Sequence, residues 1–461
     1  MNIAHLHIEH LKLFETFDLS FIRGDGKLYE WTILIGENGT GKTSILQAIA
    51  MAAAGQLQVN NLADRLVSQL RDRRDSSPMS IDATFRFSIL PPGSERPYPG
   101  IGEGSIFTRP SILQSQVSLA EDETSLRGKS AYHGHSVENP LDTARAKNVP
   151  LWFVAGYGVG RQLPDASMRP LLNQPSIERM MPLFRSDRAL TSTGFINYFG
   201  GEREAGEDSS EAQPDTARMY SRMLKRALLD VESLLPMIND LELRGHGGVR
   251  KAGDLQERDR FKQRVTAEAE IKLPLNALSH GYQSTIAWIA DLLGHIVLEA
   301  ETELQLEDMR GLVLIDELDL FLHPTWQVVL VHALRKTFPG MQFVASTHSP
   351  LVLAGLRPDR DQIVRLQVDP QSGNIVRVPV EEDPRTMTGT ELLRTYFNID
   401  DIHPDEAGRA LRDYRYLAAN PFRSDADDGK LNTLRAYLAA QDIDPHFEPV
   451  PRETIATAET P

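Results

Sequence analysis

The stretch Gly36-Glu37-Asn38-Gly39-Thr40-Gly41-Lys42-Thr43 sets the fold of this chain. It matches the pattern G-x-x-x-x-G-K-[ST], whose glycines let backbone N–H groups turn inward around a phosphate. The apolar segment 31–35 precedes it, and the small and apolar residues 42–54 follow it. This pattern predicts a buried strand, a glycine-rich turn and a helix whose positive end also faces the phosphate.

The lysine and the hydroxyl at the end of this loop have distinct expected roles. Lys42 is expected to reach the β- and γ-phosphates of a nucleoside triphosphate, and the Thr43 hydroxyl to contact Mg²⁺. We expect the nucleotide to contact Gly36, Asn38, Gly39, Thr40, Gly41, Lys42, Thr43 and Ser44. ATP and Mg²⁺ are therefore the expected ligands.

Two later strands are expected to bring side chains to this loop. The apolar run 311–315 ends in Asp316 and Glu317, which suit Mg²⁺ binding through water and activation of the attacking water. The run 342–346 is followed by His348, placed to contact the γ-phosphate. Glu317, His348 and Lys42 are thus the candidate catalytic residues.

A third segment, Asn276 to Ser284, precedes an apolar helix. Ser279 and Gly281 at the start of this helix would present free N–H groups and a positive dipole to an anion. Lys42 already serves the γ-phosphate bound by the same chain. The expected anion is therefore the γ-phosphate bound by a second copy of the chain.

Together these segments resemble the ABC-type ATPase superfamily, in its soluble branch of RecF-like, SMC-like and OLD-type ATPases. The resemblance rests on GENGTGKTS, LSHGYQ, LIDELDLFLHPTWQ and STHSP, in the order of the superfamily. The third motif is especially similar to bacterial stand-alone "AAA family" ATPases, several of which serve anti-phage systems such as Septu. The resemblance implies an ATPase with slow turnover that forms head-to-head dimers.

The resemblance also assigns residues that the patterns alone do not. It places Asp319 and His323 in a D-loop at the dimer interface, Gln283 in the signature that acts in trans, and Lys12 near the phosphates. Two features depart from the family: the signature reads LSHGYQ, and no obvious Q-loop glutamine is present. Gln162 and Arg161, after a predicted strand, are the candidates for that place, with a plain turn as the alternative.

The expected fold class is α/β: an ABC-type P-loop ATPase head with a mixed, mostly parallel sheet flanked by helices. A small antiparallel β subdomain, a helical insertion and a helical C-terminal region complete it. The expected domains are 1–165 with an irregular insertion at about 91–149, a helical insertion at 166–270, 271–380, and a helical region with a disordered tail at 381–461.

Composition excludes several classes of site. Of 461 residues, 49 are Lys or Arg and 64 are Asp or Glu, a net charge of −15, which disfavours wrapping nucleic acid with the whole surface. There is no cysteine, so disulfides, thiolate metal sites and cysteine nucleophiles are excluded. With no signal peptide and no membrane-length apolar run, we expect a cytoplasmic protein.

Related classes fit less well. Gly281 lies farther from Asp316 than in transporter ATPases, no long coiled coil is present, and no strand pair suits a TOPRIM nuclease after His348. Asp425 to Asp427 reads as a solvated turn. The histidine groups His5/His7/His10 and His133/His135 do not suit a metal site. The arginines of 65–74 and of 409–415 suit a solvated face better than a DNA contact.

The sequence leaves three hypotheses. In the first, an ATP-dependent switch regulates a separate nuclease or other effector, in anti-phage defence by resemblance. In the second, a RecF-like ATPase binds DNA directly. In the third, a nucleotide-gated scaffold barely turns over ATP, although the Asp316–Glu317 pair counts against it. Expected partners are a second copy, an effector and, in the second hypothesis, DNA, with no membrane.

Overall fold

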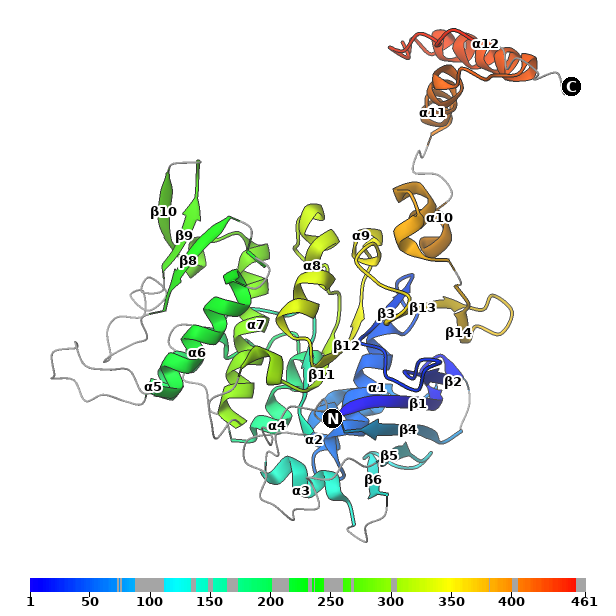
Figure 1. Cartoon of the computed structure of the whole chain (residues 1–461). Helices are drawn as coiled ribbons and strands as arrows, with labels where there is room; N and C mark the ends of the chain where they lie inside the picture. The colour runs from blue at the N-terminus through cyan, green and yellow to red at the C-terminus, as the bar shows by residue number, and fades with distance from the viewer. Residues whose placement is uncertain are drawn as a thin grey trace, which may run out of the picture. The chain divides into compact units, whose positions relative to one another are not determined.

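The structure is a computed structural model. It describes residues 1–72, 74, 77–87, 112–133, 138–147, 152–163, 173–200, 215–230, 234–235, 237–243, 260–266, 269–299, 305–380, 382–399 and 405–452. The chain divides into two compact units, Met1–Met387 and Thr388–Pro461 (Figure 1).

The centre of the first unit is a six-stranded sheet in the order β14-β13-β3-β12-β11-β7. Its strands are β3 (Trp31–Gly36), β7 (Val154–Tyr157), β11 (Gly311–Ile315), β12 (Met341–Ser346), β13 (Asp361–Val368) and β14 (Ile375–Val378). All neighbours pair in parallel except β13 and β14. The strands β11 and β12 are buried at every residue, as their continuous apolar runs predict. Because β3, β12 and β11 are adjacent, the loops after them meet at one edge of the sheet.

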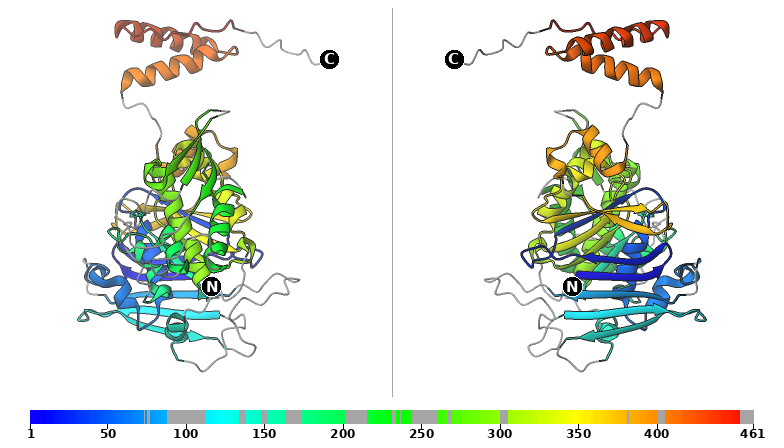
Figure 2. Two further views of the ribbon diagram at one scale, coloured as in Figure 1. Left: turned by 90° about the vertical axis from the view of Figure 1, so that its left-hand side faces the viewer. Right: turned by 90° about the vertical axis from the view of Figure 1, so that its right-hand side faces the viewer.

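A second sheet is entirely antiparallel, in the order β2-β1-β4-β5-β6. Its strands are β1 (Asn2–Leu11), β2 (Phe14–Ser20), β4 (Met79–Arg86), β5 (Ile112–Leu119) and β6 (Arg127–Tyr132). Buried and partly exposed residues alternate along β4, so one face of this sheet is covered. Figure 2 shows this sheet, coloured blue to cyan, as a layer of its own.

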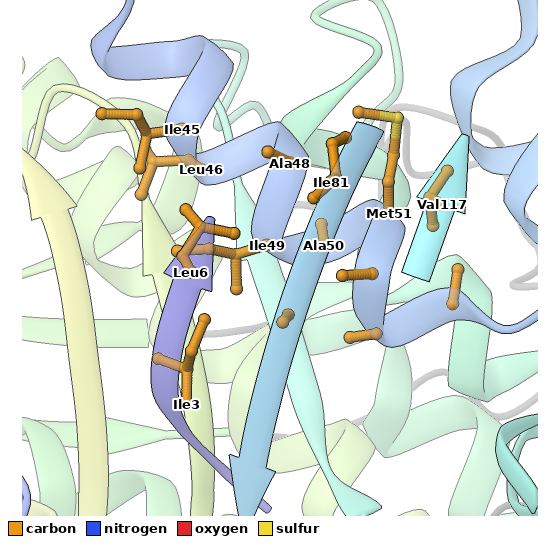
Figure 3. Close-up of a cluster of buried hydrophobic side chains, with 14 of the residues drawn as sticks. Ile3, Leu6, Ile45, Leu46, Ala48, Ile49, Ala50, Met51, Ile81 and Val117 are labelled. Carbon is orange, nitrogen blue, oxygen red and sulfur yellow. The ribbon is translucent and has the colours of Figure 1, made fainter. Parts of the chain in front are cut away.

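Helix α1 (Lys42–Ala54) joins the two sheets into one core. Its small and apolar residues are buried nearly throughout, and strands of both sheets share its hydrophobic cluster. In Figure 3, Leu46 and Ile49 lie beside Leu6, while Met51 lies beside Ile81 and Val117. The helix that carries Lys42 and Thr43 is therefore held on several sides, which fixes the phosphate loop at its start.

The remaining helices of the first unit lie around this core. The longer ones are α3 (Pro140–Lys147), α6 (Asp215–Lys225), α7 (His280–Glu299) and α8 (Pro324–Thr337). Shorter ones are α2 (Val59–Ala63), α4 (Pro175–Glu178), α5 (Phe195–Gly200) and α9 (Pro350–Leu353). Helix α7 begins at the predicted signature, and α8 follows the predicted D-loop.

The second unit contains α10 (Gly389–Phe397), α11 (Glu406–Ala419) and α12 (Asp425–Ala440). Helices α11 and α12 share a small core centred on Tyr414, Leu431 and Leu438. The expected turn at 425–427 is instead the first turn of α12, because Ser424 and Asp427 form a capping box. The tail from 453 onward lies outside the described residues.

Two expected segments differ from the structure. The insertion expected at 91–149 contains β5, β6 and α3, while 88–111 lies outside the described residues. Strand β5 escaped prediction because its inward positions include Ser115, which bonds to a backbone oxygen of α1, and its outward positions include the apolar Ile112 beside two glutamines and a serine.

The block 166–270, expected to be helical, ends in a three-stranded sheet of β8 (Ile238–Glu242), β9 (Arg260–Arg264) and β10 (Glu270–Pro274). Only a few of its side chains, such as Phe261, are buried, so its period-2 pattern is weak. The domain boundaries given above stay a prediction.

The fold class is confirmed: a mixed, mostly parallel sheet with flanking helices, an antiparallel sheet and a helical C-terminal region. Among the described residues, no helix combines the length and apolar character that crossing a bilayer requires.

Candidate functional site

The phosphate loop connects β3 to α1 and contains three glycines with positive φ angles, two of which also lack room for a side chain. Gly36, Gly39 and Gly41 have φ angles of 150°, 85° and 77°, which favour glycine. A Cβ on Gly36 would lie 2.4 Å from the Leu366 carbonyl oxygen, and one on Gly41 would lie 2.5 Å from the Phe14 ring. The loop therefore combines a backbone that only glycine adopts easily with neighbours that leave no room for a side chain.

Lys42 lies within this loop. Its Nζ donates to the carbonyl oxygens of Gly36 and Glu37, each at 2.8 Å. The residue is only 7% exposed. Burial lowers the pKa of Lys42, and the nearby carboxylates of Asp316 and Glu317 oppose that shift. An ammonium held by neutral carbonyls can exchange them for phosphate oxygens, which are stronger acceptors.

The other predicted contact residues lie at the tip of the loop and in the first turn of α1. Asn38 and Gly39 are exposed at its tip, and the Thr40 hydroxyl donates to the Glu37 carbonyl at 2.8 Å. Ser44 is buried in the first turn of α1, where its hydroxyl accepts a bond of 2.9 Å from Lys12 Nζ. Burial lowers the pKa of Lys12. The structure thus brings Lys12 next to the phosphate-loop helix.

A chain of oxygen atoms crosses from the loop to the neighbouring strand ends. The Thr43 hydroxyl donates to Asp316 Oδ2 at 2.6 Å. The Ser346 hydroxyl, at the end of β12, donates to Asp316 Oδ1 at 2.5 Å and accepts from the Glu317 N–H at 2.8 Å. Mg²⁺ is commonly bound by only a few protein oxygens, together with waters and phosphate oxygens. The Thr43 hydroxyl and the Asp316 carboxylate lie beside the phosphate loop and therefore fit that ion.

The Glu317 backbone has an unusual conformation, with φ of 48°. Glu317, the residue that the sequence predicts as the catalytic base, therefore has a left-handed backbone conformation. Arg161 donates to the carbonyl oxygens of Asp316 and Glu317, at 3.2 and 2.5 Å. Of the two Q-loop candidates, Arg161 is buried behind the carboxylates and Gln162 is exposed.

The predicted D-loop is tied to the segment that carries His348. Asp319 Oδ1 accepts from the Thr347 hydroxyl at 2.5 Å and from the His348 N–H at 3.3 Å. The His348 side chain itself is exposed. His323 caps α8, with Nδ1 accepting from the Thr325 N–H at 3.4 Å. Asp319 and His323 therefore have bonding partners within the chain.

The predicted signature meets the D-loop rather than the phosphate loop of its own chain. A Cβ on Gly281 would lie 2.6 Å from the Phe321 carbonyl oxygen, and the rings of Tyr282 and Trp326 are 4.5 Å apart. Ser279 is exposed. Within the residues that the structure describes, no bond joins Ser279, Gly281 or Gln283 to the loop at 36–43.

The Gln283 amide is also used locally. Its Nε2 donates to the carbonyl oxygens of Asn276 and Leu278, at 3.1 and 2.7 Å. These bonds hold the turn that precedes α7, so Gln283 braces the signature turn and does not extend away from it.

Other predicted clusters lie away from this site. Arg71 donates to the Glu121 carbonyl and Arg74 bonds to Asp72 and Asn374, while Arg73 lies outside the described residues. Arg415 donates to the Pro445 carbonyl. His135 also lies outside the described residues, and among the described ones no group of three or more His, Cys, Asp or Glu residues is placed to hold a metal ion.

Ser346, Thr347 and Arg161 are residues of the site that sequence reasoning missed or did not assign. Ser346 and Thr347 have a local signal, because they end the strand next to the one that carries Asp316. Arg161 was a candidate for the Q-loop place, but its contact with the backbone of Asp316 and Glu317 has no local signal, since these partners are more than a hundred positions away in the sequence.

Two models of known protein families match separate parts of this chain. Residues 1–139 match the family model described as "AAA ATPase domain". Residues 197–354 match the one described as "AAA domain, putative AbiEii toxin, Type IV TA system". Each model covers less than half of the chain.

Two similar proteins extend along nearly the whole chain. The Septu protein PtuA of Bacillus mycoides is 24% identical over 449 residues, covering 95% of this chain and 50% of the relative. The Retron Ec83 probable ATPase of Escherichia coli is 24% identical over 491 residues, covering 96% of this chain and 85% of the relative. The chain thus spans half the length of the first of these relatives.

A third relative and one solved structure complete the comparison. The Retron Vc95 probable ATPase of Vibrio cholerae is 44% identical over 87 residues, which is 19% of this chain and 17% of the relative. The SMC head domain from Thermotoga maritima aligns with a TM-score of 0.42 and 13% identity, over 83% of this chain and 100% of that one. On the two family models and the relatives, this chain contains AAA-family ATPase domains and is homologous to the Septu PtuA and retron ATPases.

Proposed function

We propose that this chain binds Mg²⁺·ATP at 36–43, hydrolyses it slowly and acts as a nucleotide-dependent switch. The observation that carries the proposal is the oxygen chain from Thr43 through Asp316 and Ser346 to the Glu317 N–H. It joins the phosphate loop to the strand that carries the predicted base. Homology to Septu and retron ATPases supports the same activity.

In this proposal each side chain has one task. Lys42 leaves the Gly36 and Glu37 carbonyls and binds the β- and γ-phosphate oxygens. Thr43 and Asp316 hold Mg²⁺, which supplies neutralisation of phosphate charge when bound. Glu317 orients and deprotonates the attacking water.

His348 and Lys12 are proposed to contact phosphate oxygens from two other sides. His348 is exposed at the end of β12, next to the strand that carries Asp316, and can contact the γ-phosphate. Lys12 reaches the first turn of α1 at Ser44. Together with Lys42 they would surround the triphosphate with positive or hydrogen-donating groups.

The signature is proposed to act on a second copy of the chain. Ser279 is exposed at the start of α7, Gly281 fits against the D-loop, and Gln283 braces the turn. A γ-phosphate bound by a partner would meet these N–H groups, so two chains associate head to head around two nucleotides. ADP lacks the bridging phosphate, so hydrolysis would weaken the dimer.

The proposed output is control of a separate nuclease or other effector in anti-phage defence. This step rests on the resemblance and on the Septu and retron relatives. The 166–270 segment and the helices after 381 are the proposed output surfaces, because they lie outside the residues assigned to ATP.

The DNA-binding alternative draws less from the structure. Arg71 and Arg74, two of the arginines that would contact DNA, bond within the chain. The scaffold alternative requires that the Asp316–Glu317 pair remain without catalytic use.

A single-turnover assay tests the proposed activity. Wild type and Glu317→Gln are mixed with limiting radiolabelled ATP and Mg²⁺, and both phosphate release and bound nucleotide are measured. We expect both proteins to bind ATP and only the wild type to release phosphate at an appreciable rate. Equal release from both would contradict the role of Glu317, and binding with no release from either would favour the scaffold.

A further inference from the structure

Arg161 is buried next to the backbone of Asp316 and Glu317, the two acidic residues that follow β11. It follows β7 through a turn in which Gly158 and Gly160 press against the 182–186 backbone; a Cβ on Gly160 would lie 2.0 Å from the Ser186 oxygen. This close approach directs the next residue inward. Arg161 is 6% exposed, and its Nε has no hydrogen-bond partner among the described residues.

The guanidinium instead uses one nitrogen on two consecutive carbonyls. Nη2 donates to Asp316 O at 3.2 Å and to Glu317 O at 2.5 Å. Burying an arginine with one unpaired N–H costs free energy of folding. An arginine that served only to stabilise the fold would therefore be unfavourable at this position. Both hydrogen bonds of Arg161 are to the backbone of Asp316 and Glu317, where the chain turns after β11.

That turn is strained. Glu317 has φ of 48°, a conformation that costs a non-glycine residue about 1–2 kcal/mol. Its peptide is also held on the N–H side: Asp316 N–H donates to the Tyr157 carbonyl and Glu317 N–H to the Ser346 hydroxyl, each at 2.8 Å. Strain of this kind persists only where surrounding bonds over-determine the backbone.

Charge supports the same arrangement. Burial lowers the pKa of Arg161 to about 10, while the carboxylates of Asp316, Asp319 and Glu317 act in the opposite direction. The side chain therefore stays cationic at neutral pH, beside three acidic residues of the site.

We propose that Arg161 is a positioning residue for ATP hydrolysis: it holds the carbonyls of Asp316 and Glu317 so that the Glu317 carboxylate faces the attacking water. The inference rests on the proposed ATPase activity and deepens it. Arg161 does not touch the nucleotide in this account. It acts through Glu317, so its loss slows the chemical step and leaves ATP binding intact.

Arg145 provides a matched control. It is 5% exposed, and it also donates to backbone carbonyls, from Nε to Ala53 O at 2.8 Å and from Nη1 to Trp152 O at 2.7 Å. Burial likewise lowers its pKa, to about 9. Its partners lie at the far end of α1 and before β7, away from Asp316. Replacing either arginine should therefore cost stability, but only one should change catalysis.

The test compares Arg161→Lys and Arg161→Met with Arg145→Lys and Arg145→Met in the full chain. The Tm, the Kd for Mg²⁺·ATP and the single-turnover rate are measured for each protein. We expect Arg161→Met to lower the rate about 100-fold, the scale of a small misplacement of a catalytic group, with Kd within about twofold of wild type. Arg161→Lys, which keeps the charge and loses the guanidinium geometry, should lose about tenfold.

Double substitution provides the second readout. If Arg161 acts through Glu317, adding Arg161→Met to Glu317→Gln should slow release by less than about twofold further, because residues that act as one unit are not additive. The inference is overturned if the Arg161 variants keep rates within twofold of their Arg145 counterparts, or if rate and affinity fall together. Should Arg161→Met not fold, the same comparison of the two lysine variants decides.

Failure of the proposed function has a different signature. If wild type releases no more phosphate than Glu317→Gln, the ATPase proposal fails and this inference fails with it. If wild type exceeds Glu317→Gln while Arg161 and Arg145 variants behave alike, only the positioning role is wrong.

Discussion

Ser346→Ala is the substitution that most directly perturbs the oxygen chain. The Ser346 side chain is fully buried, and its hydroxyl is the only atom removed. That hydroxyl donates to Asp316 Oδ1 at 2.5 Å and accepts from the Glu317 N–H at 2.8 Å. The change therefore leaves a carboxylate oxygen and a backbone donor without this partner, while the strand β12 keeps its backbone bonds.

The expected loss of stability follows from those two bonds. A hydrogen bond to a charged group contributes about 1.5–3 kcal/mol, and an orphaned buried donor costs about 1–3 kcal/mol. We therefore expect a loss of about 3 kcal/mol in the free energy of unfolding. For the unit Met1–Met387, whose unfolding entropy is about 0.8 kcal/mol/K, this lowers the Tm by about 4 °C.

Ser115→Ala is the matched control. Ser115 is buried in β5 and donates one bond of 2.7 Å, to the Ala52 carbonyl, away from the carboxylates. Its loss should cost about 1 kcal/mol, or about 1 °C in Tm.

Calorimetry and a single-turnover assay read the two variants together. Ser346→Ala should also slow phosphate release about 10- to 100-fold by loosening Glu317, whereas Ser115→Ala should not. Equal effects of the two substitutions on Tm and rate would refute the reasoning.

Three further predictions use other parts of the site. Thr43→Ala should weaken Mg²⁺-dependent ATP binding by at least about tenfold and leave metal-free binding nearly unchanged in equilibrium titrations; equal losses with and without Mg²⁺ would argue against Thr43 as a ligand. Gly281→Ala places a Cβ 2.6 Å from the Phe321 oxygen and should abolish ATP-dependent association in sedimentation, while Gly389→Ala, with open space around it, should not. Asp291 on α7 is buried, and burial raises its pKa from 3.8 to about 6, against bonds from Thr191, Ser192 and Tyr157. The folded state is therefore most stable when Asp291 is protonated. The free energy of unfolding should fall by about 3 kcal/mol as the pH rises from about 4 to about 6. Asp291→Asn should flatten that slope in urea titrations, and an unchanged slope would show that other groups cause it.

The backbone of the phosphate loop and its place beside the strand ends were predictable because their constraints are local. The loop at 36–43 needs glycine at fixed positions for its backbone, and continuous apolar runs mark β3, β11 and β12. Parallel pairing of these strands then brings Thr43, Asp316 and Ser346 to one edge. Motif spacing is therefore enough to bring Thr43 and Asp316 together, whereas Ser346 was not assigned from the sequence.

Long-range and weakly patterned features were not predictable. Strands β8 to β10 bury few side chains and read as polar segments. Strand β5 hides its alternation because Ser115 is inward and satisfied by α1. Arg161, one of the two candidates for the Q-loop place, finds its carbonyl partners only after β7 and β11 pair.

The central claim is that ATP joins two copies of this chain through the signature. The measurement that tests it most directly is the molar mass of Glu317→Gln in solution by light scattering, with and without Mg²⁺·ATP. The account predicts one mass without nucleotide and twice that mass with it. If ATP binds and the mass does not change, Ser279 and Gly281 do not complete a partner's site, and the dimer-gated switch is wrong.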